Sequence, residues 1–174
     1  MPFIRNKRIK GKKYAYLVEN TWTTKGPRQK VTKYLGQVIE FQIEAEPYTS
    51  TLENPEEFLR EKSFKEIVKN TVKYELSRRE FKESNEGFSK GDIKISKDYK
   101  VTINGKNAVL QMNRGFLCES TVNELLNYDG AEDAAGKRLA KAIIACGIKN
   151  DEELFIELFA KSRPKENKET TIYY

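Results

Sequence analysis

The first 36 residues of the chain concentrate positive charge among aromatic side chains. They hold ten of the 32 lysines and arginines but only one of the 26 acidic residues, Glu19, so this segment carries +9 while the remaining 138 residues sum to −3. Lysine and arginine neutralise phosphates, and tyrosine and tryptophan rings stack on exposed bases. The composition is typical of a surface that meets nucleic acid. The alternative is a solvated basic face that only keeps the protein soluble.

The side chains that could make these contacts are basic or aromatic and all lie in the opening segment. They are Arg5, Arg8, Lys10, Lys12, Lys13, Tyr14, Tyr16, Trp22, Arg28, Lys30 and Lys33. Lysines and arginines would fix phosphates while the rings stack on bases. Trp22 is the single tryptophan, and at the end of an expected strand its ring is either exposed for recognition or a hydrophobic plug over the sheet.

A residue type needed for most familiar hydrolytic mechanisms is missing. The chain has no histidine, which removes Ser/His/Asp and Cys/His triads and histidine metal ligands. No glycine-rich phosphate loop can be found. The triplets Asp92-Ile93-Lys94 and Glu80-Phe81-Lys82 have the acid-x-Lys spacing of metal nucleases, but such triplets arise by chance in a chain that is 33% charged. We therefore expect no enzyme, no metal and no cofactor.

The two cysteines indicate packing rather than reactivity. Cys118 and Cys146 stand 28 residues apart without a close thiol or imidazole partner, so neither a zinc site nor a disulfide framework is predicted. Both are expected as apolar side chains near a helical core. The longest apolar run, Ala142 to Cys146, is five residues, which predicts no membrane span and a cytoplasmic protein.

The opening segment reads as antiparallel strands separated by turns. Strands are expected over Phe3 to Ile9, Lys13 to Trp22 and Arg28 to Leu35. In the second strand, the period of two places Tyr14 and Tyr16 on one face, opposite Ala15 and Leu17. One face should pack on the protein and the other can recognise a ligand. A further strand is expected over Gln37 to Ile43.

Helix signals follow a connection over residues 44–54. Asn54 and Pro55 predict the start of a short helix, and the capping-box spacing from Ser63 to Glu66 predicts a longer amphipathic one ending near Glu83. Residues 84–91 are rich in turn-forming types. Asn104-Gly105 then predicts a hairpin that pairs Ile103 with Lys106, Val101 with Ala108 and Tyr99 with Leu110.

The C-terminal third is predicted to be helical. The spacing from Thr121 to Glu124 predicts a helix start. Leu139, Ala142, Ile143 and Cys146 form a helical stripe that stops at Gly147. Asn150 to Glu153 predicts the start of a last helix that ends before Pro164, and residues 162–174 are expected to be a flexible tail.

These elements predict an α+β protein in three parts. A basic, antiparallel, β-rich module occupies residues 1–45. An α+β module over residues 46–161 contains the central amphipathic helix, the Asn-Gly hairpin and a C-terminal helical cluster. Residues 162–174 form the tail.

Two stretches of the opening segment carry a resemblance. Tyr14 to Asn20 reads YAYLVEN, and Gly26 to Gly36 reads GPRQKVTKYLG. The pattern resembles the N-terminal segment of some insertion-sequence DDE transposases and of some uncharacterised archaeal proteins. In the transposases such a segment is expected to help to hold DNA, which implies that role for Arg28, Lys30 and Lys33. No catalytic core is implied, because residues 37–174 are too few for a ribonuclease-H-like domain with insertions.

The sequence therefore favours a non-catalytic nucleic-acid-binding protein. RNA or a ribonucleoprotein is slightly favoured over DNA, because aromatic-rich strands suit unpaired bases. The alternative is a protein-interaction or assembly factor whose C-terminal helices bind a partner while the basic strands form a solvated face. No membrane partner is expected.

Overall fold

The computed structural model describes residues 2–41, 46–131 and 133–163 and confirms the α+β class. The described residues form one nine-stranded sheet, five α-helices and a short 3-10 helix, η1. The strands are β1 Phe3–Ile9, β2 Lys12–Thr23, β3 Gly26–Glu40, β4 Lys82–Ser84, β5 Gly87–Lys90, β6 Ile93–Ser96, β7 Val101–Ile103, β8 Lys106–Met112 and β9 Gly115–Leu117. The helices are η1 Tyr48–Thr51, α1 Pro55–Glu61, α2 Phe64–Ser77, α3 Glu119–Leu126, α4 Ala135–Ala145 and α5 Glu152–Ser162.

The sheet runs in the order β1-β2-β3-β8-β7-β6-β5-β4, with β9 pairing β8 off this path. Among the described strands only the β3–β8 pair is parallel, and it joins the basic strands to the rest of the sheet. A parallel pair needs a long connection, which here carries α1, α2 and strands β4 to β7. The carboxyl ends of β3 and β8 therefore lie at the same edge of the sheet.

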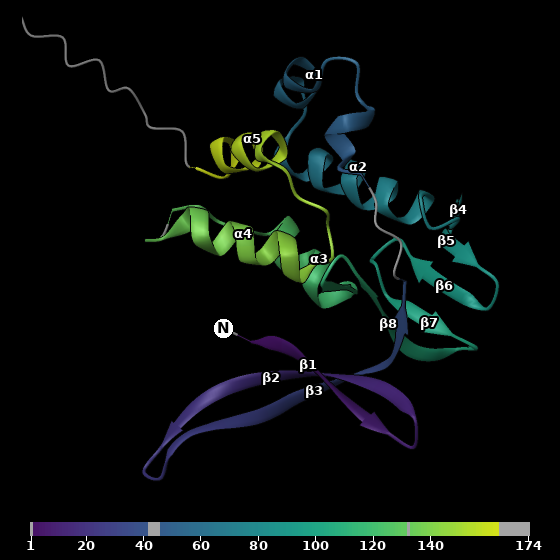
Figure 1. Ribbon diagram of the computed structural model, residues 1–174, viewed down its shortest axis with the longest axis vertical. Coiled ribbons are helices and arrows are strands. Elements are labelled where there is room, and N and C mark those ends of the chain that lie inside the picture. Colours follow the sequence, from purple (N-terminus) through teal and green to yellow (C-terminus); the bar gives the residue numbers. More distant parts are fainter. Residues whose placement is uncertain (1, 42–45, 132, 164–174) are drawn as a thin grey trace, which may run out of the picture.

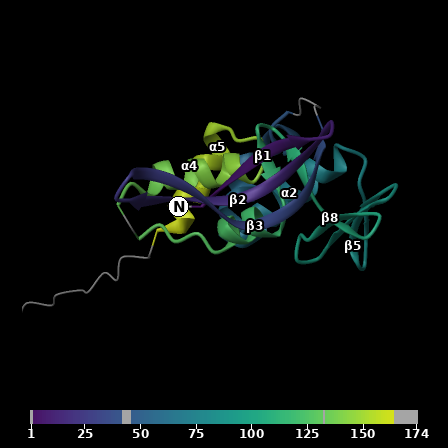
Figure 2. The same ribbon diagram turned by 90° about the horizontal axis from the view of Figure 1, so that it is seen from below.

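The three basic strands form a projecting antiparallel meander, residues 3–36, which we call the arm. In Figure 1 the arm runs beneath α3 and α4, and Figure 2 shows it extending across the molecule. Lys10 and Gly11 join β1 to β2 with φ angles of 48° and 81°, as a two-residue type I′ turn requires. Two register irregularities occur between β2 and β3, at Ala15/Tyr16 and at Leu17/Val18.

Gly36 lies where the arm meets the rest of the sheet. Its φ of 117° is in a region that side chains rarely adopt, and a β-carbon there would lie 2.0 Å from the carbonyl oxygen of Asn107. The glycine of the KYLG stretch thus allows β3 to approach the β7–β8 hairpin closely. Residues 37–40 continue β3 instead of starting the separate strand expected over Gln37 to Ile43, whose end lies outside the described residues.

The helices gather on one side of the molecule around the main core. Helix α3 contacts α2 and α4, while α5 contacts α1, α2 and α4. The predicted stripe of Leu139, Ala142, Ile143 and Cys146 is buried there, as are Leu154 and Leu158 of α5. A second, smaller cluster lies at the base of the arm and consists of Ala15, Leu35, Val38, Val109 and Cys118. Both cysteines are buried free thiols, as predicted.

Several local signals are confirmed. Asn54 caps α1, and Ser63 and Glu66 form the predicted capping box of α2. The Asn104-Gly105 turn pairs Ile103 with Lys106 and Val101 with Ala108. Asp151 caps α5 by accepting a hydrogen bond from the Leu154 backbone N–H.

The predicted end of α2 near Glu83 is wrong, because the helix ends at Ser77. Glu80 adopts a φ of 64°, and the Phe81 N–H donates to the Leu76 carbonyl oxygen at 3.1 Å. This six-residue closure is a left-handed C-terminal cap without the glycine that usually marks one. Phe81 is 4% exposed, so its ring is buried just beyond the end of the helix.

Three other predictions are corrected by the structure. Residues 82–90 form the β4–β5 hairpin, although the turn-rich composition of residues 84–91 predicted no strand there. Tyr99 is buried but has a φ of 61° and does not pair with Leu110, whose strand partners are Ile39 and Leu117. Helix α3 begins at Glu119, before the predicted start at Thr121, because the Thr121 hydroxyl accepts from the Cys118 N–H.

Two predicted boundaries adjoin residues outside the described part of the chain. The boundary between modules at residues 45 and 46 follows residues 42–45, and the nine-stranded sheet includes strands from both sides of it. Of the predicted tail, Ser162 ends α5 and residues 164–174 lie outside the described residues. No helix among residues 2–41, 46–131 and 133–163 is both long and apolar enough to cross a membrane.

Candidate nucleic-acid interface

One face of the arm carries a cluster of tyrosines. The Tyr34 ring on β3 lies 5.4 Å from the Tyr16 ring and 6.3 Å from the Tyr14 ring, centroid to centroid, with both pairs tilted. Tyr16 and Tyr34 are direct cross-strand partners, which sets their spacing. Tyr34 is 48% exposed, so the cluster presents aromatic surface to solvent instead of entering a core.

Two cations of β1 lie beside the tyrosines. Arg5 pairs across the strands with Tyr16, and Lys7 pairs with Tyr14. Partners in register share a face of the sheet, so both cations belong to the aromatic side. Arg5 also donates a hydrogen bond to the Gln29 side chain on β3, which holds its guanidinium across the arm. We call Arg5, Lys7, Tyr14, Tyr16 and Tyr34 the tyrosine face.

Burial and ring proximity keep the Tyr34 phenol neutral. Desolvation raises the pKa of the Tyr34 phenol, and the neighbouring phenols of Tyr14 and Tyr16 raise it further. A raised phenol pKa favours the protonated, uncharged form. Tyr34 therefore offers a neutral ring and hydroxyl group, and the positive charge of this face is supplied by Arg5 and Lys7.

The lysines and arginine of the GPRQKVTKYLG stretch, Gly26 to Gly36, lie on the opposite face. Lys33 pairs with Leu17, Lys30 with Glu19 and Arg28 with Thr21. These β2 partners alternate with Tyr14 and Tyr16, so they point to the other side of the strand. Near the base of the arm this face packs on the smaller core through Ala15 and Leu17. The eleven residues predicted as one binding set are therefore divided between two faces.

The tip of the arm exposes the single tryptophan. Trp22 is 84% exposed, next to the turn at residues 24–25, so it does not act as a plug over the sheet. The Thr23 hydroxyl donates to the Gly26 carbonyl oxygen at 2.8 Å, which closes the turn. Such an indole can stack on a partner without rearrangement of the arm.

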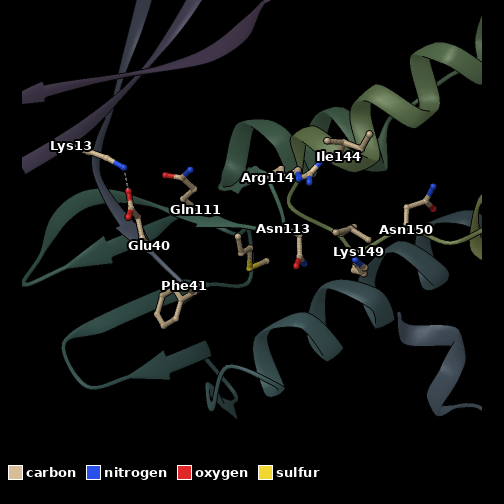
Figure 3. Close-up of a pocket in the computed structure, with 11 residues that line it drawn as sticks. Lys13, Glu40, Phe41, Gln111, Asn113, Arg114, Ile144, Lys149 and Asn150 are labelled. Carbon is tan, nitrogen blue, oxygen red and sulfur yellow. Dashed lines mark hydrogen bonds and ion pairs between the residues drawn. The ribbon is translucent and has the colours of Figure 1, made fainter. Parts of the chain in front are cut away.

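The other end of the arm forms a second basic group. Arg8, Lys10 and Lys12 are exposed around the β1–β2 turn. Lys13 is half-buried and forms an ion pair with Glu40 at the end of β3. Figure 3 shows this pair at one side of a cavity whose other side is formed by Asn113, Arg114 and Lys149.

Sequence reasoning missed several of the residues that the structure brings together. Tyr34 and Lys7 were visible as members of the basic, aromatic segment, and only the register shows that they share the tyrosine face. Arg114 and Lys149 lie outside that segment and carry no motif. Their sole local signal is the dipeptide Asn113-Arg114 before Gly115, a turn with an unfavourable second residue.

The alternative chemistry weighed from the sequence has no geometric support in the described residues. No three cysteine, aspartate or glutamate side chains gather there as a metal site would require. The acid of the Glu80-Phe81-Lys82 triplet instead bonds to Lys90 at 2.9 Å. Burial raises the pKa of the Cys146 thiol, with a further contribution from Cys118, so the thiol form is favoured.

Comparisons with protein-family models, with curated proteins and with solved structures give no match for this chain. The resemblance of the arm to transposase N-terminal segments therefore stays a prediction, and function has to be argued from the geometry.

Proposed function

We propose that the protein is a non-catalytic nucleic-acid-binding protein and that the arm is its binding element. The observation that carries the proposal is the tyrosine face, where the exposed Tyr34 and the half-buried Tyr14 and Tyr16 lie beside Arg5 and Lys7. Exposed rings on a sheet stack on bases, and adjacent cations neutralise the phosphates between them. A cytoplasmic location accompanies this proposal, since both described cysteines are free thiols.

Single-stranded RNA, free or within a ribonucleoprotein, suits the tyrosine face better than duplex DNA. Bases in a duplex are stacked on one another and cannot reach the rings, whereas unpaired bases can. The opposite face of the arm favours duplex DNA. There the β2–β3 hairpin projects Arg28 and Lys30 from a two-stranded ribbon, an element that fits a DNA major groove.

Binding of fluorescein-labelled single-stranded RNA, single-stranded DNA and duplex DNA of equal length, measured by anisotropy, tests this proposal. Tyr16→Ala should weaken single-strand binding about 5-fold or more, because stacking on one ring contributes ~1–3 kcal/mol. Lys65→Ala on α2 is the control, since Lys65 is exposed and distant in the fold. The proposal fails if the wild type binds none of the three probes at low salt.

A second candidate function is protein interaction through the C-terminal helices. A cavity of about 350 Å³ separates the arm from α3 and α4 and is lined in part by Phe3, Ile4, Leu17 and Phe116. Ala145 of α4 is exposed and also lines this cavity. A partner held here should remain bound after nuclease treatment in a pull-down and be lost with Ala145→Asp, whereas a partner bridged by nucleic acid is lost with nuclease alone.

A further inference from the structure

A cavity of about 870 Å³ lies at the carboxyl ends of the parallel strands β3 and β8. Its volume is in the range of ligand pockets, ~300–1,000 Å³, and the carboxyl ends of parallel strands commonly bind ligands. Its walls come from the start of β2, the ends of β3 and β8, the β8–β9 turn and the α4–α5 connection (Figure 3).

The described residues that line the cavity carry more positive than negative charge. They include three cations, Lys13, Arg114 and Lys149, and one acid, Glu40, which is paired with Lys13. Within residues 2–41, 46–131 and 133–163, neither Arg114 nor the Lys149 ammonium forms an ion pair. Two cations are thus available to an anionic ligand without breaking an existing pair.

The turn that carries Arg114 is strained, and hydrogen bonds to Glu75 and to the Gly147 carbonyl oxygen hold it in place. Asn113 and Arg114 have φ angles of 45° and 69°, and glycine would be favoured at the second position. The Asn113 amide donates to Glu75 Oε2 and to the Gly147 carbonyl oxygen, both at 2.9 Å. The Lys149 N–H donates to Glu75 Oε1 at 2.7 Å. One buried carboxylate therefore positions both cations, and strain of this kind is common at binding sites.

Two amide side chains of the wall have unused hydrogen-bonding capacity. The Gln111 Oε1 and Asn150 Oδ1 atoms are buried and have no hydrogen-bond partner among the described residues. Buried polar atoms are normally paired, and an amide can pair with the edge of a base. Phe41, Met112 and Ile148 add apolar surface. The wall thus combines groups that suit a phosphate, a base edge and a base face.

We propose that this cavity binds one unpaired nucleotide, with its phosphate at Arg114 and Lys149 and its base edge at Gln111. The inference rests on the proposed function, and it extends the interface beyond the arm. Lys13 connects the two, since it belongs to β2 and also lines the cavity. A single nucleic-acid strand that lies on the arm can pass the cations of the β1–β2 turn and place one nucleotide in the cavity.

The test uses the full chain and two mononucleotides, adenosine and uridine 5′-monophosphate, titrated by NMR. The wild type should bind at least one of them. Arg114→Gly should weaken binding about tenfold, as expected for the loss of a charge-assisted hydrogen bond, while keeping or raising the melting temperature because glycine relieves the strain at φ 69°. Lys149→Ala should weaken it similarly. Lys137→Ala, an exposed residue of α4, is the charge-matched control and should leave binding unchanged.

The outcomes separate this inference from the proposed function. No mononucleotide binding by the wild type, or equal affinity in the wild type and both cavity variants, overturns the cavity assignment. If labelled single strands still bind the arm in that case, the proposed function stands without the cavity. If mononucleotides bind and single strands do not, the proposed function fails and the cavity remains a nucleotide site.

Discussion

Arg79 donates a hydrogen bond to Glu75 across 2.6 Å, and both side chains are fully buried. Glu75 lies in the last turn of α2, and Arg79 follows two residues after the helix ends. The same carboxylate accepts from Asn113 in the β8–β9 turn and from the Lys149 backbone beyond α4. Glu75 and Arg79 therefore hold together three segments that are far apart in sequence: the end of α2, the β8–β9 turn and the α4–α5 connection. The last two of these line the candidate nucleotide cavity.

Removal of the Glu75 charge should destabilise the protein strongly. Glu75→Gln keeps the shape of the side chain but removes the carboxylate charge with which the Arg79 guanidinium is paired in the interior, which costs about 3–5 kcal/mol. Urea unfolding monitored by circular dichroism measures the loss. Glu86→Gln, at an exposed position, is the control. A loss below about 1 kcal/mol would show that the pair does not hold these segments together.

The sequence predicted elements whose signals are local. The caps Asn54 and Ser63 and the Asn104-Gly105 turn were found because each depends on residues within a few positions of one another. It could not predict the end of α2, where Glu80 occupies a left-handed position without glycine and tertiary burial of Phe81 supplies the stabilisation. The β8–β9 turn was also missed, because Arg114 occupies a left-handed position, φ 69°, where the sequence offers no glycine to indicate a turn.

The sequence predicted which residue types make up the candidate interface, but only in part where each residue lies on the arm. The sequence placed the basic and aromatic residues in three strands, but strand register decides which of them share a face. The β-bulges between β2 and β3 shift that register and have no clear sequence signal. Arg114 and Lys149 reach the end of the arm only because β3 pairs with β8, a contact between residues that are distant in sequence.

Gly36→Ala should disrupt the junction between the arm and the rest of the sheet. The new β-carbon would meet the Asn107 carbonyl and the backbone would be strained at φ 117°, a combined cost of about 2–4 kcal/mol. Gly11→Ala is a matched control, because Gly11 has a φ of 81° but no heavy atom within 4 Å of a β-carbon. Thermal unfolding should show a clearly larger shift for Gly36→Ala; equal shifts would contradict the close approach.

Cys146 should be unreactive in the folded protein. Burial raises the pKa of its thiol, so little thiolate is present even at mildly alkaline pH, and reagents cannot reach the sulfur. A chromogenic disulfide reagent should titrate no thiol rapidly in the native state and both thiols in concentrated guanidinium. Cys146→Ser, with Cys118 intact, identifies the part of the labelling signal that belongs to Cys146. Rapid labelling of the native protein that disappears in this variant would contradict the prediction.

The start of α2 should contribute a component to acid unfolding. Hydrogen bonds from the Ser63 side chain and backbone hold the pKa of Glu66 below 4.5. A lowered folded-state pKa stabilises the protein above the unfolded value, and this contribution disappears as the pH falls through the folded one. In Ser63→Ala, the pKa of the Glu66 carboxyl measured by NMR should rise toward its ordinary value of 4.5. The free energy of unfolding should then depend less on pH below that value. An unchanged titration midpoint would show that Ser63 does not hold the carboxylate.

The division of the arm into two faces predicts two different salt dependences. If about six phosphates are contacted, the logarithm of affinity should fall against the logarithm of salt concentration with a slope of roughly −4 to −5. For a single strand on the tyrosine face, Arg5→Ala with Lys7→Ala should reduce the slope by about 1.4, because each lost phosphate contact contributes ~0.7.

The matched variant on the opposite face separates single-strand binding from duplex binding. Arg28→Ala with Lys30→Ala removes the same charge from the other side of the strands. It should leave the single-strand slope nearly unchanged while weakening duplex DNA, since a duplex groove would enclose the ribbon and contact both faces. Equal losses of slope for both double variants on a single strand would mean that the strand wraps around the arm, and the tyrosine face would then not be a separate site.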